Sequence, residues 1–220
     1  MRRPGLRAGG GAGGTLLAVA TILIAGSGCS RAGNETGPPA GFGMLSGQTV
    51  LVLPVQYVSR APAGWIGGAS TAQAAARQAD SEIAFALREQ GGRAHWIMPE
   101  EQVEALQRRP SIEVDPYMLS ADEARREGRK LKDVRDPLYG EIRLLAALFD
   151  ARLALWPMEV YAAPGEDAGS GRLTIRTFLL DARSGDVLWY GEIASPATDE
   201  ATTPAAMAAA AQAFAVQVSP

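Results

Sequence analysis

The chain contains a single cysteine, Cys29, among its 220 residues, so it cannot form an intramolecular disulfide and packing alone must hold its fold together. Cys29 follows a segment with the three parts of a secretory leader. Three arginines lie within residues 1–7, an apolar run spans residues 15–25, and small residues occupy 26–28. The apolar run is shorter than the roughly 20 residues that cross a bilayer, which favours a leader that is removed over a permanent anchor.

A cysteine directly behind such a leader resembles the lipobox of bacterial lipoproteins, in which this residue is lipidated and becomes the first of the mature chain. Gly26 stands where the lipobox has a Leu-like residue. The resemblance implies that residues 1–28 are a lipoprotein signal peptide. It also implies that Cys29 carries a diacylglycerol and usually a further acyl chain of the palmitate type, which together anchor the protein to a membrane. The alternative is a chance thiol in an ordinary secreted leader.

The residue after the cysteine bears on location. Some bacteria use Asp there to retain lipoproteins in the inner membrane, and this chain has Ser30. The resemblance therefore implies an outer-membrane lipoprotein that faces the periplasm, or one on the cell membrane if the source lacks an outer membrane.

The charge balance excludes two kinds of partner. Removal of residues 1–28 takes away three of the 21 Lys and Arg and none of the 24 Asp and Glu, which leaves a net charge near −6. Nucleic-acid binding requires a basic face, and binding to anionic lipid requires a polybasic segment. Neither is expected here.

Composition also divides the mature chain. Residues 29–47 are rich in Gly, Pro, Ala and polar residues without an apolar period, which predicts a flexible tether that makes no contact with the domain. Residues 48–220 have the length of one domain and are predicted to form a single periplasmic α/β domain.

The apolar patterns predict one mixed sheet with helices packed on it, in the order β-α-β-α-α-β-β-β-α. Pro54 lacks an amide hydrogen and predicts a break in the first strand. Ser120 and Glu123 have the spacing of a capping box at the start of the third helix. Strands are expected at 49–58, 93–98, 152–162, 172–181 and 186–194. Helices are expected at 71–90, 99–109, 121–132, 139–149 and 204–216.

Four short segments match a known pattern. They are VLVLPV at 50–55, HWIMPEEQVEAL at 95–106, LLAALFDARLALWPMEV at 144–160 and DARSGDVLW at 181–189. With the element order, they resemble the domain at the start of the TolB translocation protein. They also resemble domains of the curli-secretion lipoproteins and of lipoproteins that activate penicillin-binding proteins. Val55 stands where these proteins usually have Phe, and 149–151 reads Phe-Asp-Ala where Gly-Ala-Asp is common.

The resemblance implies a non-enzymatic envelope lipoprotein that docks to a cell-envelope complex and assists its assembly or regulation. A channel is not implied, because the chain has no spare alternating segments for barrel hairpins.

The residues themselves suggest no catalytic site. His95 is the only histidine and Cys29 the only cysteine, so a His/Cys zinc set cannot be assembled, and no Ser-His-Asp triad is proposed. Acidic residues at 122–123, 133–136 and 166–167 lie in polar segments and are interpreted as solvated surface. No catalytic residue, metal ligand or cofactor is predicted. The alternative function is a solute-binding or hydrolytic lipoprotein with a pocket that the sequence does not reveal.

The candidate partner-binding residues are Trp65 and Ile66, in the glycine-rich loop 59–70 (SRAPAGWIGGAS). The glycines leave the backbone mobile and give the two apolar side chains little local structure to pack against. An exposed Trp-Ile pair predicts anchors for an unidentified envelope protein. The alternative is that Trp65 folds back onto the domain. The sequence leaves the oligomeric state open.

Overall fold

The computed structural model describes residues 42–60, 71–90, 92–164, 170–196 and 205–219. It contains one open mixed sheet with helices packed on it, which confirms the predicted fold class. The strands run in the order β3-β1-β4-β5-β6, and β2 pairs with β4 where β1 has ended. Neighbours of β1 are parallel to it, whereas β4, β5 and β6 form an antiparallel meander. The strands are β1 Thr49–Val52, β2 Tyr57–Ser59, β3 His95–Ile97, β4 Leu153–Pro164, β5 Gly171–Asp181 and β6 Val187–Ala194.

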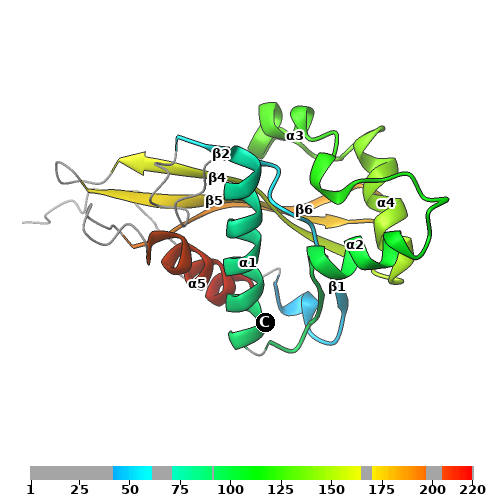
Figure 1. Cartoon of the computed structure of the whole chain (residues 1–220), viewed down its shortest axis with the longest axis horizontal. Coiled ribbons are helices and arrows are strands. Elements are labelled where there is room, and N and C mark those ends of the chain that lie inside the picture. Colours follow the sequence, from blue (N-terminus) through cyan, green and yellow to red (C-terminus); the bar gives the residue numbers. More distant parts are fainter. Residues whose placement is uncertain (1–41, 61–70, 91, 165–169, 197–204, 220) are drawn as a thin grey trace, which may run out of the picture. The chain divides into compact units, whose positions relative to one another are not determined.

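Helices cover both faces of the sheet (Figure 1). On one face, α1 and α5 pack together and share an apolar core with alternate residues of β4, β5 and β6. On the other face, α3 and α4 cover a second core that contains Trp156 and Phe178. No helix in the described ranges has the length and apolar content needed to cross a membrane. The helices are α1 Ala72–Gln90, α2 Pro99–Gln107, α3 Asp122–Glu127, α4 Leu138–Leu148 and α5 Ala206–Val218, with short 3-10 turns η1 Phe42–Leu45, η3 Pro116–Met118 and η4 Gly128–Lys130.

The break predicted at Pro54 is confirmed. β1 ends at Val52 and β2 begins at Tyr57, and both run parallel to β4. Between them the Val55 amide donates to Asp80 of α1 instead of to a neighbouring strand. The proline therefore divides one predicted strand into two, because it cannot supply a ladder hydrogen bond.

The third helix begins within one residue of the predicted start, but the predicted capping box does not form and the predicted end is wrong. The helix begins at Asp122, and Ala121 at its N-cap makes no side-chain bond. Ser120 instead donates from its amide and its hydroxyl to the Glu141 carboxylate, both at 2.8 Å. Ser120 therefore bonds to Glu141 of α4 instead of capping the helix. At the other end, Gly128 has a positive φ of 51° and ends the helix before the predicted residue 132.

The prediction that residues 29–47 make no contact with the domain is wrong at its C-terminal end. Phe42 and Leu45 are 1% and 0% exposed and belong to the core on the α1–α5 face. The Phe42 ring meets Trp189 of β6 edge to face, with centroids 4.9 Å apart. Trp189 lies across Gly191, where a Cβ atom would collide with the indole ring. The apolar ring of Trp189 therefore provides the contact through which residues 42–45 pack onto the sheet.

Candidate functional site, a tyrosine and arginine surface

The sheet carries polar side chains on one face, beyond the core that α3 and α4 cover. Along β4 this core reaches Met158, and along β5 it extends towards Gly171 only as far as Phe178, with Tyr57 and Tyr190 packed at its edge. Alternate positions of the strands here hold tyrosine, arginine and glutamate. Together with Arg125 of α3, these strand residues form a set that we call the Tyr–Arg surface: Tyr57, Arg125, Glu159, Tyr161, Arg176, Tyr190 and Glu192.

An irregularity in β4 places Glu159 on this face. Trp156 and Met158 point into the α3–α4 core, but Val160 points into the opposite core, so the register of β4 shifts between Trp156 and Glu159. The shift turns Glu159 and Tyr161 towards α3. If side chains had alternated regularly along β4 from Trp156, Glu159 and Tyr161 would have faced the core under α1 and α5.

Glu159 is the buried centre of the Tyr–Arg surface. Its side chain is only 6% exposed and accepts hydrogen bonds from Arg125 of α3 at 2.8 Å and Arg176 of β5 at 2.7 Å. The Ser59 hydroxyl at the end of β2 donates a third, at 2.8 Å. Two guanidinium groups and one hydroxyl thus compensate the burial of one carboxylate.

Glu192 is the second carboxylate of the Tyr–Arg surface and lies nearer to solvent. It accepts hydrogen bonds from the hydroxyls of Tyr161 and Tyr190, at 2.9 and 2.8 Å, and from Arg176 at 3.2 Å. Burial alone would raise the pKa of Glu192, but these three donors together lower it. Arg176 bridges Glu159 and Glu192, so the two carboxylates belong to one network.

The tyrosines remain protonated donors. Burial, and then the hydrogen bond to Glu192, raise the pKa of Tyr190 to about 12. Burial and the 2.8 Å hydrogen bond to Asp122 do the same for Tyr57. The guanidinium groups of Arg125 and Arg176 lie over the rings of Tyr57 and Tyr161, 4.2 and 5.4 Å from their centroids.

The chemistry open to the Tyr–Arg surface depends on the partners of its acidic and hydroxyl groups. Both carboxylates are paired, and Ser59 donates to a carboxylate without any histidine beside it. Within the described ranges no group of three or more His, Cys, Asp or Glu side chains could hold a metal ion. Tyrosine and arginine are the residue types, with tryptophan, that contribute most to protein–protein binding energy.

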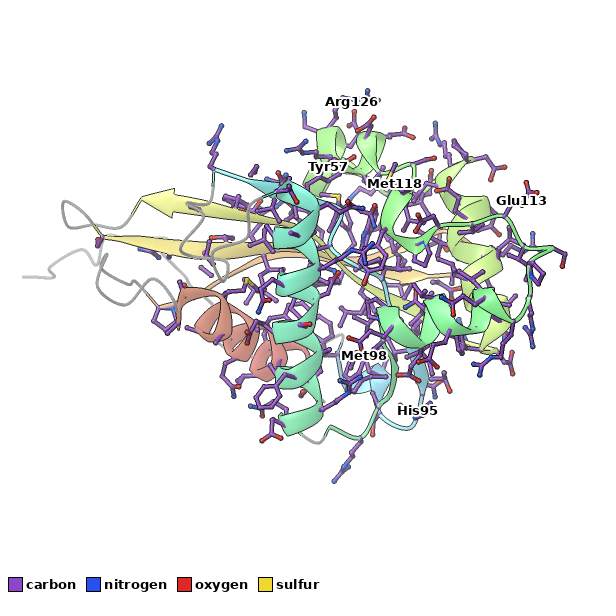
Figure 2. The ribbon with its side chains drawn as sticks, in the orientation of Figure 1. Tyr57, His95, Met98, Glu113, Met118 and Arg126 are labelled. Carbon is purple, nitrogen blue, oxygen red and sulfur yellow. The ribbon has the colours of Figure 1, made fainter. Side chains whose placement is uncertain are left out.

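The residues predicted from sequence as sites, Cys29, Trp65 and Ile66, lie outside the described residues. In the sequence, residues 61–70 follow soon after β2, and Ser59 at the end of β2 bonds to Glu159. His95 lies exposed on β3, away from Tyr57 and α3 (Figure 2).

Sequence reasoning missed the Tyr–Arg surface. A signal was present in the polar residues two apart in predicted strands, Glu159 with Tyr161 and Tyr190 with Glu192. The polar residues in the strands do not reveal that Arg125 of α3 contacts Glu159, because the two residues are far apart in the sequence.

Comparison with solved structures gives distant likenesses, of which three are described here. No family model matches the chain, and no curated protein matches it either. The LpoB C-terminal domain from Salmonella enterica is 15% identical over 70% of this chain and 84% of its own, with a TM-score of 0.35. Lipoprotein GNA1162 from Neisseria meningitidis is 15% identical over 70% and 83%, with a TM-score of 0.36. The PelC dodecamer from Paraburkholderia phytofirmans is 13% identical over 80% and 89%, with a TM-score of 0.38. At TM-scores of this size, none of the three assigns an activity or a partner to this chain.

Proposed function

We propose that this chain is a lipid-anchored, non-enzymatic lipoprotein that docks to a cell-envelope protein through the Tyr–Arg surface and residues 61–70. Its anchor is Cys29, and it faces the periplasm from the outer membrane. The docked protein belongs to an envelope complex whose assembly or regulation it assists.

The observation that carries the proposal is a preorganised, half-buried cluster of three tyrosines and two arginines where the sheet meets α3, at the edge of the α3–α4 core. Ion pairs and hydrogen bonds hold these side chains in place, so a partner would immobilise few additional rotamers. Trp65 and Ile66, in residues 61–70 that follow β2 in the sequence, are proposed to supply apolar anchors for the same partner.

Partner capture tests this surface. We expect photo-crosslinking of the full chain in its native envelope to trap one dominant protein. Tyr161→Ala and Trp65→Ala should each weaken that capture by at least about ten-fold, the effect of a 1.4 kcal/mol loss. Both variants should unfold at nearly the wild-type temperature.

Phe85→Ala is the matched control, because Phe85 is an aromatic residue on α1 that is 63% exposed and belongs to the opposite face of the sheet. Equal loss of capture in Phe85→Ala would contradict the proposed surface. A fall of about 3–5 kcal/mol in the stability of Trp65→Ala would instead show that this side chain belongs to the core.

Lipidation is tested at its own residue. Cys29→Ala should leave the protein unprocessed or release it from the membrane fraction, because the acyl chains provide the anchor. The intact mass of the mature native protein should exceed that of residues 29–220 by the mass of the acyl groups. An unmodified thiol at residue 29 of the mature protein would refute this part of the proposal.

A further inference from the structure

A small cavity lies near the carboxyl ends of the parallel strands β1 and β3, between α1, α2 and η3, with a volume of about 160 Å³. Open α/β sheets bind ligands at this edge, where crossover connections leave in opposite directions. Met98, which precedes α2, marks the end of β3 in Figure 2. The polar side chains that line the cavity are Arg77, Asp80, Ser81, Glu100 and Tyr117.

Asp80 is the least expected of these side chains, because it is only 7% exposed. Its Oδ1 accepts the Val55 amide hydrogen at 2.8 Å, whereas its Oδ2 has no hydrogen-bond partner in the described part of the chain. Burial raises the pKa of Asp80 well above its usual range, against the opposing effects of the Val55 amide and Arg77. A buried carboxyl oxygen without a partner is costly, and a donor from outside the chain would relieve that cost.

The other lining groups have spare hydrogen-bonding capacity. Arg77 lies over the Tyr117 ring, 4.9 Å from its centroid, and forms no ion pair with any described residue. Glu100 has one loose ion pair, 3.7 Å from Arg88, with both side chains more than half exposed. The hydroxyls of Ser81 and Tyr117 make no hydrogen bond within the described ranges. Four side-chain types therefore converge on one cavity with their polar groups largely unused.

We propose that this cavity binds a primary ammonium group, carried by a lysine side chain or by a small free amine. An ammonium offers three N–H donors, which match Asp80 Oδ2, the Glu100 carboxylate and the hydroxyl oxygen of Ser81 or Tyr117. Once Asp80 is charged, the cavity holds two carboxylates against the single guanidinium group of Arg77. A monovalent cation would neutralise the excess and favour this charged form over the protonated form that burial favours.

The cavity favours this ligand over two others. Its volume holds a head group of a few heavy atoms and is too small to enclose a nucleotide. Two carboxylates beside a guanidinium group do not form the oxygen cage that a divalent metal ion requires.

Nuclear magnetic resonance titration of the full chain tests the proposal. The probe is propylammonium chloride; tetramethylammonium chloride has the same charge without N–H donors, and sodium chloride tests for an adventitious cation. We expect only propylammonium to shift the amide signals of Val55, Asp80 and Glu100 saturably and to lower the pKa of Asp80. Asp80→Asn should weaken binding by at least about ten-fold. A lysine derivative blocked at both ends that binds more tightly than propylammonium would identify a peptide lysine as the source, and equal or weaker binding would identify a small amine.

Asp80→Asn is expected to fold, since the amide oxygen can still accept from Val55. If it does not fold, Glu100→Gln decides the question, because Glu100 is exposed and its charge contributes to the same cavity. Glu104→Gln, an exposed change elsewhere on α2, should bind as the wild type does. The proposal is overturned if propylammonium gives no saturable shift, if tetramethylammonium or sodium gives the same shift, or if the folded Asp80 or Glu100 variant binds unchanged.

Discussion

Replacing Phe42 by Ala is expected to lower the free energy of unfolding by about 3–5 kcal/mol, the usual cost of removing a fully buried aromatic ring. Phe42 is 1% exposed and covers Trp189, which itself crosses Gly191 with no room for any other side chain. The loss would expose the indole ring and open a cavity at the edge of the α1–α5 core. In a domain of this size each kcal/mol lowers the melting temperature by about 2–4 °C.

Urea unfolding followed by tryptophan fluorescence measures the effect of Phe42→Ala. Met44→Ala is the matched control, because Met44 lies in the same 3-10 turn and is 47% exposed. We expect the control to stay within about 0.5 kcal/mol of the wild type, as surface substitutions usually do. Equal stability of the two variants would show that the segment before residue 48 does not belong to the domain in solution.

Glu159→Ala is expected to cost about 2–3 kcal/mol, because it leaves two guanidinium groups around an empty, poorly solvated position. Removing one partner of a buried ion pair usually costs about 3–5 kcal/mol. The side chains of Arg176 and Arg125 are 22% and 39% exposed, so water and Glu192 compensate part of that loss. The expected cost is therefore below the usual range.

Two comparisons separate this effect from a general loss of stability. Glu192→Ala removes a carboxylate that is 39% exposed from the same network and should cost at most about 1 kcal/mol, as exposed ion pairs do. A double-mutant cycle of Glu159→Ala with Arg176→Met should give a coupling energy of about 0.5–3 kcal/mol. A zero coupling energy would mean that the two side chains do not interact in solution.

The two variants also bear on docking. Glu159→Ala frees Arg125 and Arg176 from their shared acceptor and should weaken partner capture as well as stability. Glu192→Ala frees the hydroxyls of Tyr161 and Tyr190 and should weaken capture while stability changes little. If the loss of partner capture in both variants were proportional to the loss of stability, the network would stabilise the fold without taking part in docking.

Local chemistry was sufficient to predict most of the elements. The break at Pro54 depends on a missing amide hydrogen, and the turn between β5 and β6 depends on Gly185, whose φ is 83°. The helix of residues 72–90 shows its buried alanine and isoleucine stripe in the sequence itself. Each of these signals lies within a short stretch of sequence, so contacts with distant parts of the chain do not alter the predicted element.

The candidate site could not be predicted in the same way. Two predicted anchors, Trp65 and Ile66, lie outside the described residues and stay predictions. Glu159 and Tyr161 face α3 only because the register of β4 shifts beside Pro157, and Arg125 reaches Glu159 across 34 residues of sequence. Asp80 similarly pairs with Val55, 25 residues away, and keeps one oxygen unpaired.

By itself the sequence determined that the single cysteine allows no intramolecular disulfide, and it determined the periods of the strands and helices; the leader before Cys29 stays a prediction. These properties follow from the composition and from the spacing of apolar residues, and both can be read from short stretches of sequence. Only the tertiary structure decided that Phe42 joins the core, that Ser120 bonds to Glu141 instead of capping a helix, and that the Tyr–Arg surface assembles. In each case a residue interacts with a partner far along the chain instead of following its local preference. The sequence does not reveal this, because the two residues become neighbours only in the folded protein.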